Sequence, residues 1–233
     1  MRLRKRPWVA EAILEFTDFV MPGDNPPGEE RKGRWAEAFG RAAPLMIELG
    51  TGKGDFISQI AEREPGVNFI GIETQQDVLY TAAKKVREKA LPNVRLLVFD
   101  AARIDTIFAP GEAARIYINF CDPWPKKRHA KRRLTSRAFL DRYRVILARG
   151  GEIHFKTDNR PLFDFSLEEF AAAGLAVSEV SYDLHADGLP GNIETEYERK
   201  FSGLGEKINR CVVTFPGKEQ ESGQRARTEI LDQ

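Results

Sequence analysis

The residues best suited to chemistry lie in one stretch, in which a single carboxylate precedes a dense run of cations. Asp122 is followed by Pro123-Trp124-Pro125, and then by six Lys or Arg residues and one His within the eight positions 126–133. The two prolines fix two φ angles and remove two donors, so the loop should hold Asp122 steadily. Cations without interleaved acids repel one another unless phosphates neutralise them. The run therefore favours nucleic-acid contact over the usual solvated helix face.

A second candidate site is a glycine-rich turn that follows the apolar run Leu45 to Leu49. Gly50 and Gly52 belong to the sequence Glu-Leu-Gly-Thr-Gly-Lys-Gly at 48–54, and glycines let a backbone turn sharply against a ligand. The turn resembles the nucleotide-binding turn of doubly wound folds. Its spacing does not meet the dinucleotide fingerprint GxGxxG, and the lack of Gly-Lys-Ser/Thr argues against a phosphate-cradling NTPase loop.

Three carboxylates accompany this turn at the ends of apolar runs. Glu48 lies on the first run, Glu73 ends the run 69–72, and Asp100 ends the run 96–99. Glu73 could accept hydrogen bonds from ribose hydroxyls, and Asp100 could reach an adenine amino group. Three acids would repel a pyrophosphate but match a cationic nucleoside such as S-adenosylmethionine. Each acid alone could be a helix cap or a solvated strand end; together with the glycines they favour a cofactor site.

Apolar runs alternate with helical patterns along most of the chain. We expect strands at 45–49, 68–72, 94–99, 115–120, 152–156, 176–184 and 207–215, and helices at 35–42, 55–64, 76–90, 136–147 and 161–173. This alternation predicts an α/β fold with a mostly parallel seven-stranded sheet covered on both faces. The last two strands have no clear helix between them, so they should form an antiparallel edge hairpin around a long functional or mobile loop, 185–205. Asp122 then follows the carboxyl end of a strand, where open α/β sheets bind ligands.

The composition and the positions of proline and glycine predict the domain organisation. The 233 residues carry 42% hydrophobic side chains and a formal net charge of +1, which suits a folded protein that is not globally basic. We expect an irregular, flexible N-terminal arm over 1–34, a folded domain over 35–216 and a polar tail over 217–233. Cys121 and Cys211 form no CxxC pair, so we expect no metal site and reduced thiols. We expect neither a signal peptide nor a membrane span, and a cytoplasmic location.

The order of these motifs resembles that of the bacterial tRNA (guanine-N7)-methyltransferases. The resemblance rests on Glu-Leu-Gly-Thr-Gly-Lys-Gly at 48–54, Gly-Ile-Glu at 71–73, and Asp-Pro-Trp-Pro-Lys-Lys-Arg-His-x-Lys-Arg-Arg-Leu at 122–134. Thr157-Asp158 and Thr195-Glu196-Tyr197-Glu198 resemble downstream motifs of the family, and the likeness spans roughly residues 35 to 215. Cys121 is a departure, because the family usually has Pro there.

The resemblance implies a Rossmann-like class I S-adenosylmethionine-dependent methyltransferase fold. It implies transfer of a methyl group from S-adenosylmethionine to the N7 atom of a guanine in the variable loop of tRNA. It implies cofactor contacts from Glu48, Glu73, Asp100 and Asp122. It implies tRNA contacts from Lys126, Asp158 and the stretch Thr195, Glu196, Tyr197 and Glu198, with Arg128, Lys131, Arg132 and Arg133 on the RNA backbone.

Guanine N7 has an in-plane lone pair and no proton, so no general base is needed. Catalysis should then come mainly from placing the reacting groups together, and Asp122 is the leading candidate for orienting the guanine, with Asp158 second. Trp124 or Tyr197 could stack on the base, or each could be an ordinary packing residue.

Alternatives from other functional classes stay open at the level of sequence. A non-catalytic RNA-binding protein on a methyltransferase fold is the main one, and the presence of Glu48, Glu73 and Asp100 argues against it. A nicotinamide-dependent oxidoreductase conflicts with the GxGxG spacing and the basic run. A methyltransferase for a small molecule or a protein would leave the basic run without a purpose. The expected partner is tRNA, and the expected assembly is a monomer or a weak homodimer.

Overall fold

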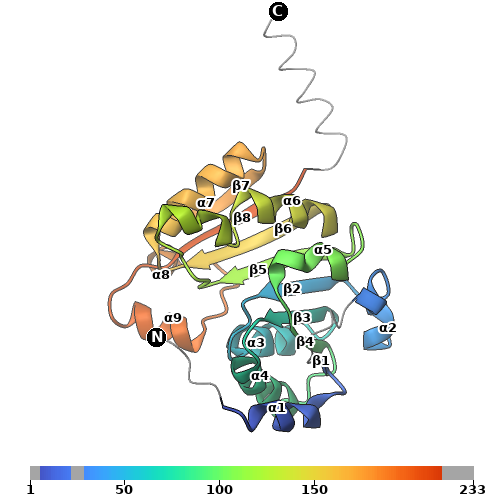
Figure 1. Cartoon of the computed structure of the whole chain (residues 1–233). Coiled ribbons are helices and arrows are strands. Elements are labelled where there is room, and N and C mark those ends of the chain that lie inside the picture. The colour runs from blue at the N-terminus through green and yellow to red at the C-terminus, as the bar shows by residue number, and fades with distance from the viewer. Residues whose placement is uncertain (1–5, 22–28, 217–233) are drawn as a thin grey trace, which may run out of the picture.

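A single mixed sheet forms the centre of the molecule, as the computed structural model shows for residues 6–21 and 29–216 (Figure 1). Within these ranges eight strands are ordered β1-β4-β3-β2-β5-β6-β8-β7. Their bounds are β1 Val20–Met21, β2 Leu45–Leu49, β3 Asn68–Glu73, β4 Val94–Val98, β5 Ala113–Asn119, β6 Leu147–Thr157, β7 Ala176–Ser181 and β8 Asn209–Thr214. Only the β6–β8 and β8–β7 pairs are antiparallel among the described strands. The predicted α/β sheet with an antiparallel edge is confirmed, and β1 is an eighth strand that we did not predict.

Helices cover both faces of this sheet, with α1, α3 and α4 on one face and α5, α6 and α7 on the other (Figure 1). The helix bounds are α1 Val9–Ala12, α2 Trp35–Phe39, α3 Asp55–Arg63, α4 Gln76–Glu88, α5 Ile104–Ile107, α6 Arg137–Ile146, α7 Arg160–Ala172, α8 Leu184–Asp187 and α9 Glu196–Ser202. Short 3-10 turns lie at η1 Ile13–Phe16, η2 Glu29–Arg31, η3 Ala101–Arg103 and η4 Lys127–Arg132. Alternate residues of β2 enter two separate cores: Ile47 packs in one and Met46 in the other, as the two-residue period of a strand requires.

Part of the segment expected to be an irregular arm is folded. Val9 and Ile13 are fully buried, Phe16 is nearly so, and Val20 of β1 pairs with Leu96 of β4. Val9, Ile13 and Phe16 are spaced by four and three positions and so share one helical face. Ile13 and Phe16 belong to the same core as buried residues of α4 and β4. The domain boundaries at residues 34 and 216 stay a prediction. Residues 1–5, 22–28 and 217–233, which include the predicted tail, lie outside the described residues.

The segment 185–205, expected to be a long loop, contains most of α8 and the whole of α9. Thr195 begins α9 by accepting a hydrogen bond from the backbone N–H of Glu198. The sequence Thr-x-x-Glu is the pattern of a capping box, so a signal for this helix was present. A smaller difference concerns Gly150 and Gly151, which lie between the helix predicted over 136–147 and the strand predicted over 152–156. α6 already ends at Ile146, and both glycines lie within β6.

The strand order places a ligand crevice between β2 and β5. From β2 the chain runs outward to β3 and β4 on one side, and β5 begins the other side. Ligands of open α/β sheets bind outside the carboxyl ends of the strands at such a reversal. Gly50, Glu73, Asp100 and Asp122 follow or end the strands β2 to β5 and therefore meet at this edge. Across the described parts of the chain, none of the helices is both long and apolar enough to cross a bilayer.

Candidate active site

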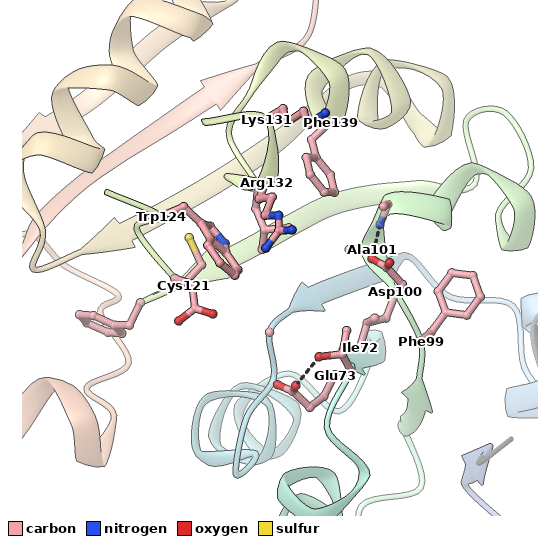
Figure 2. Close-up of a pocket in the computed structure, with 16 residues that line it drawn as sticks. Ile72, Glu73, Phe99, Asp100, Ala101, Cys121, Trp124, Lys131, Arg132 and Phe139 are labelled. Carbon is pink, nitrogen blue, oxygen red and sulfur yellow. Dashed lines mark hydrogen bonds between the residues drawn. The ribbon is translucent and has the colours of Figure 1, made fainter. Parts of the chain in front are cut away.

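A pocket of about 600 Å³ lies at this edge of the sheet. Its volume is within the range of small-molecule sites, about 300–1,000 Å³. Figure 2 shows Glu73 and Asp100 on one side of the pocket, and Trp124 and Arg132 on the other. Apolar residues that sequence reasoning did not single out contribute to the lining, among them Ile72, Phe99, Leu134 and Phe139. The pocket thus joins acids from one half of the sheet to the loop and the cations that follow β5.

The glycine turn holds the carboxylate of Glu73 in place. The backbone N–H of Gly52 donates to Glu73 Oε2 at 3.1 Å, and that of Gln75 donates to Oε1 at 2.9 Å. Gly50 and Gly52 have φ values of 74° and 58°, which glycine adopts without the strain that a side chain would cause. The carboxylate of Glu73 is therefore held beside the glycine turn by two backbone donors. Its role toward ribose hydroxyls stays a prediction.

Glu48 is not among the lining residues; it lies on β2 two positions before Gly50, and its carboxylate is buried and only half satisfied. Asn119 Nδ2 donates to Oε1 at 3.3 Å, whereas Oε2 is buried without a hydrogen-bond partner. Burial raises the pKa of this carboxyl to about 8, although the Asn119 hydrogen bond and the charge of Lys156 oppose the shift. A buried polar atom without a partner costs about 1–3 kcal/mol. A buried acceptor without a partner fits a cationic group that donates to Oε2.

Asp100 serves the fold as well as lining the pocket. Its Oδ1 accepts a hydrogen bond of 2.9 Å from the backbone N–H of Ala102 and so caps η3. The capping role that we weighed against ligand binding is therefore real, and Asp100 still lines the pocket.

The loop that carries Asp122 has a strained backbone. Phe120 and Trp124 have φ values of 52° and 42°, and a non-glycine residue in this region costs on the order of 1–3 kcal/mol unless its surroundings hold it. The guanidinium of Arg132 lies 4.9 Å from the centre of the Trp124 ring, a cation–π distance. Asp122 itself is exposed and lines the pocket. Strained residues on both sides of an exposed carboxylate are typical of a functional loop.

Asp158, which directly follows β6, lies close to the same loop. The pKa of the Cys121 thiol is raised to about 12 by burial and further by the charges of Asp122 and Asp158, so both carboxylates lie near this thiol. Tyr197 of α9 donates its hydroxyl to Asp158 Oδ2 at 3.0 Å, and its ring centre is 4.9 Å from that of Phe120. The structure therefore brings together two of the predicted substrate residues, Asp158 and Tyr197, beside the loop that carries Asp122.

Comparison with known proteins shows to which family this chain belongs. Residues 42–211 match a family model described as "Putative methyltransferase". The tRNA (guanine-N(7)-)-methyltransferase of Geobacillus sp. (strain WCH70) is 52% identical over 96% of this chain and 100% of its own length. The enzyme of the same name from Bacillus subtilis (strain 168) is 49% identical over 92% of this chain and 99% of its own. The chain belongs to the tRNA (guanine-N7)-methyltransferase family.

Solved structures support the fold of this tRNA (guanine-N7)-methyltransferase family member. An "antibiotic related methyltransferase" matches with a TM-score of 0.59 at 19% identity, over 79% of this chain and 93% of that chain. The 16S rRNA methyltransferase KamB matches with a TM-score of 0.58 at 16% identity, over 78% and 91%. At such identities the likeness concerns the fold alone. The predicted class I S-adenosylmethionine-dependent methyltransferase fold is confirmed.

Two residues of the family-like motif 195–198 are used inside the protein. Thr195 and Glu198 are 6% and 0% exposed. Thr195 caps α9, while Glu198 pairs with Lys156 Nζ at 2.6 Å and accepts from Asn192 Nδ2 at 2.7 Å. We therefore assign Thr195 and Glu198 to holding α9, not to touching RNA. Glu196 and Tyr197 are exposed, and their contact with tRNA stays a prediction.

Sequence reasoning overlooked Lys156, because in the alternating stretch Glu-Ile-His-Phe-Lys at 152–156 it falls on the polar face of the predicted strand. Its ammonium is held by Glu198, Asn192 Oδ1 and the carbonyl of Ile193, and burial lowers its pKa while Glu198 opposes that shift. These bonds fasten the segment before α9 to β6. Lys156 thus anchors the helix that presents Tyr197 to Asp158.

Glu198→Ala should destabilise the protein by about 3–5 kcal/mol, because it leaves the ammonium of Lys156 buried without its counter-charge. The free energy of unfolding in urea would measure this loss. Glu196→Ala is the matched control, because Glu196 is an exposed acid in the same helix; it should change stability by less than about 0.5 kcal/mol. Equal stability of the two variants would contradict the role assigned to the buried pair.

Proposed function

We propose that this protein transfers a methyl group from S-adenosylmethionine to the N7 atom of a guanine in tRNA. The observation that carries the proposal is the composition of the pocket, which joins an acidic wall suited to a cationic nucleoside to an exposed cationic turn, η4, suited to phosphates. The names of the relatives from Geobacillus and Bacillus support both the reaction and the substrate. We further propose that the guanine lies in the variable loop.

The residues present fit S-adenosylmethionine, which supplies a methyl group activated by a sulfonium centre. The unpartnered Oε2 of Glu48 fits the ammonium of the amino-acid portion. The fixed carboxylate of Glu73 fits the ribose hydroxyls, and Asp100 fits the adenine amino group. The purine would lie among the apolar lining residues Ile72, Phe99, Leu134 and Phe139.

The remaining task for the chain is to orient the guanine. Guanine N7 holds its lone pair in the ring plane without a proton, so no side chain has to act as a base. The carboxylate of Asp122 can accept hydrogen bonds from the guanine N1–H and amino group, and its negative charge suits the positive charge that N7 methylation creates. Burial and the charge of Asp158 raise the pKa of Tyr197 to about 12, so the phenol stays protonated and keeps Asp158 oriented.

The cations that follow Asp122 would bind the tRNA backbone. Lys126, Arg128, Lys131 and Arg132 are exposed, and the last two also line the pocket. Phosphate contacts of this kind set the register of an RNA without reading its sequence. We propose a cytoplasmic monomer or weak homodimer, because tRNA is the proposed partner and one chain supplies every residue that this pocket requires.

Methylation of unmodified tRNA with labelled S-adenosylmethionine tests the proposal. The expected product is 7-methylguanosine at one variable-loop position, mapped by reduction with borohydride and strand cleavage with aniline. Label on another atom or base would contradict the reaction. Tight tRNA binding without any transfer would favour the non-catalytic RNA-binding protein instead.

A further inference from the structure

Arg133 differs from the other cations of the basic run because its guanidinium is directed into the protein. Its side chain is half-buried, whereas Lys131 and Arg132 are exposed. Arg133 Nε donates to the carbonyl of Pro123 at 3.1 Å, and Nη2 donates to the carbonyl of Trp124 at 3.2 Å. On its other side, Cζ lies 4.2 Å from the centre of the Phe165 ring in α7. These donors face the loop and not the solvent.

These contacts connect Arg133 to the two residues that immediately follow Asp122. Pro123 and Pro125 have no backbone N–H, which limits how the loop can be held through its own donors. Trp124 also has the unfavourable φ of 42°, so an outside group must support this conformation. A planar guanidinium can bridge two successive carbonyls and stack on a ring at the same time. The ammonium of a lysine cannot do both.

We propose that Arg133 is a positioning residue for methyl transfer, which acts through Asp122 and does not bind an RNA phosphate. The inference rests on the proposed function, in which Asp122 orients the guanine. A loop without this support would place the Asp122 carboxylate less accurately, and the rate of a reaction that depends on placement falls steeply with displacement. Binding of tRNA should change little, because it depends on the exposed cations.

Three variants separate positioning from phosphate binding: Arg133→Lys, Arg133→Gln and Arg128→Gln. We would measure kcat, KM for tRNA and the salt dependence of tRNA binding, with thermal unfolding and calorimetric titration of S-adenosylmethionine as checks on the fold. Arg133→Gln and Arg133→Lys should each lower kcat by about 10- to 100-fold, with KM within about threefold and an unchanged salt slope. Arg128→Gln is the comparison for a phosphate contact, and it should reduce the salt slope by about one and raise KM for tRNA.

Arg133→Lys is the deciding variant, because it keeps the positive charge and loses the planar guanidinium that can donate to two carbonyls at once. Wild-type kcat in Arg133→Lys, together with a reduced salt slope in Arg133→Gln, would mark Arg133 as a phosphate contact and overturn the inference. If Arg133→Gln does not fold, Arg133→Lys alone still decides, since a phosphate contact would retain kcat there. If the wild-type protein methylates no tRNA, the proposed function is refuted together with this inference. If the wild-type protein is active and the Arg133 variants behave as a phosphate contact predicts, this inference alone is refuted.

Discussion

Asp122→Ala should lower the methylation of tRNA to about 1% of wild type or less, with the fold nearly intact. Loss of one group that stabilises developing charge typically costs about 100- to 1,000-fold in rate. Asp122 is exposed, so its truncation leaves no cavity and should change stability by less than about 0.5 kcal/mol. Single-turnover methylation with saturating S-adenosylmethionine would isolate the effect on the chemical step.

The control for Asp122 is another exposed acid, Asp141 of α6, which forms an i,i+4 pair with Arg137. Asp141→Ala should retain wild-type turnover, because this pair lies outside the pocket lining. Turnover of Asp122→Ala within a few-fold of wild type would remove Asp122 from the proposed mechanism. In that case Asp158 would become the leading candidate for orienting the guanine.

Glu48→Gln should weaken S-adenosylmethionine binding by at least about 100-fold and yet stabilise the ligand-free protein. Loss of a buried charged hydrogen-bond partner typically costs 2–5 kcal/mol in binding, and a neutral amide cannot match an ammonium. Isothermal titration at constant pH would measure the change in affinity. Affinity within tenfold of wild type would contradict the assignment of the Glu48 carboxylate to the ammonium.

The stabilising effect of Glu48→Gln follows from proton linkage. Folding raises the pKa of Glu48 from 4.5 to about 8, so the folded protein keeps a proton that the unfolded chain releases between these values. The contribution of Glu48 to stability is therefore greatest below pH 4.5 and declines as the pH rises toward 8. Glu48→Gln removes this decline, and its gain in melting temperature over wild type should grow from pH 5 to pH 8. The exposed Glu88→Gln is the control; a constant difference across this range would contradict the linkage.

The sequence alone was sufficient for the order of the strands β2 to β8 along the chain and for the acids at the strand ends. Strand and helix periodicity are local properties, so the alternation from Leu45 to Phe215 predicted a parallel sheet with an antiparallel edge. Once that order is known, residues that end parallel strands must share one edge. The meeting of Glu73, Asp100 and Asp122 at one pocket followed from this rule.

Other features depended on contacts between distant segments. Val9 and Ile13 precede a stretch of sequence rich in Pro and Gly, 22–28, and only their burial shows that they belong to the core. Thr195 and Glu198 belong to a family-like motif, yet burial against Lys156 gives them a structural role. The spacing of residues along the chain contains no information on such burial.

The eight residues of the basic run, 126–133, also combine a property that the sequence determined with one that only the tertiary structure decided. The sequence determined that cations cluster beside Asp122, and charge alone made them equivalent candidates for phosphate binding. The tertiary structure separated them, because Arg133 meets the carbonyls of Pro123 and Trp124 and the ring of Phe165, while Lys131 and Arg132 stay exposed. The physical reason is that a side chain's partners are set by where the fold directs it. The two N–H groups of Arg133 that bond the protein's own carbonyls are not available to a phosphate.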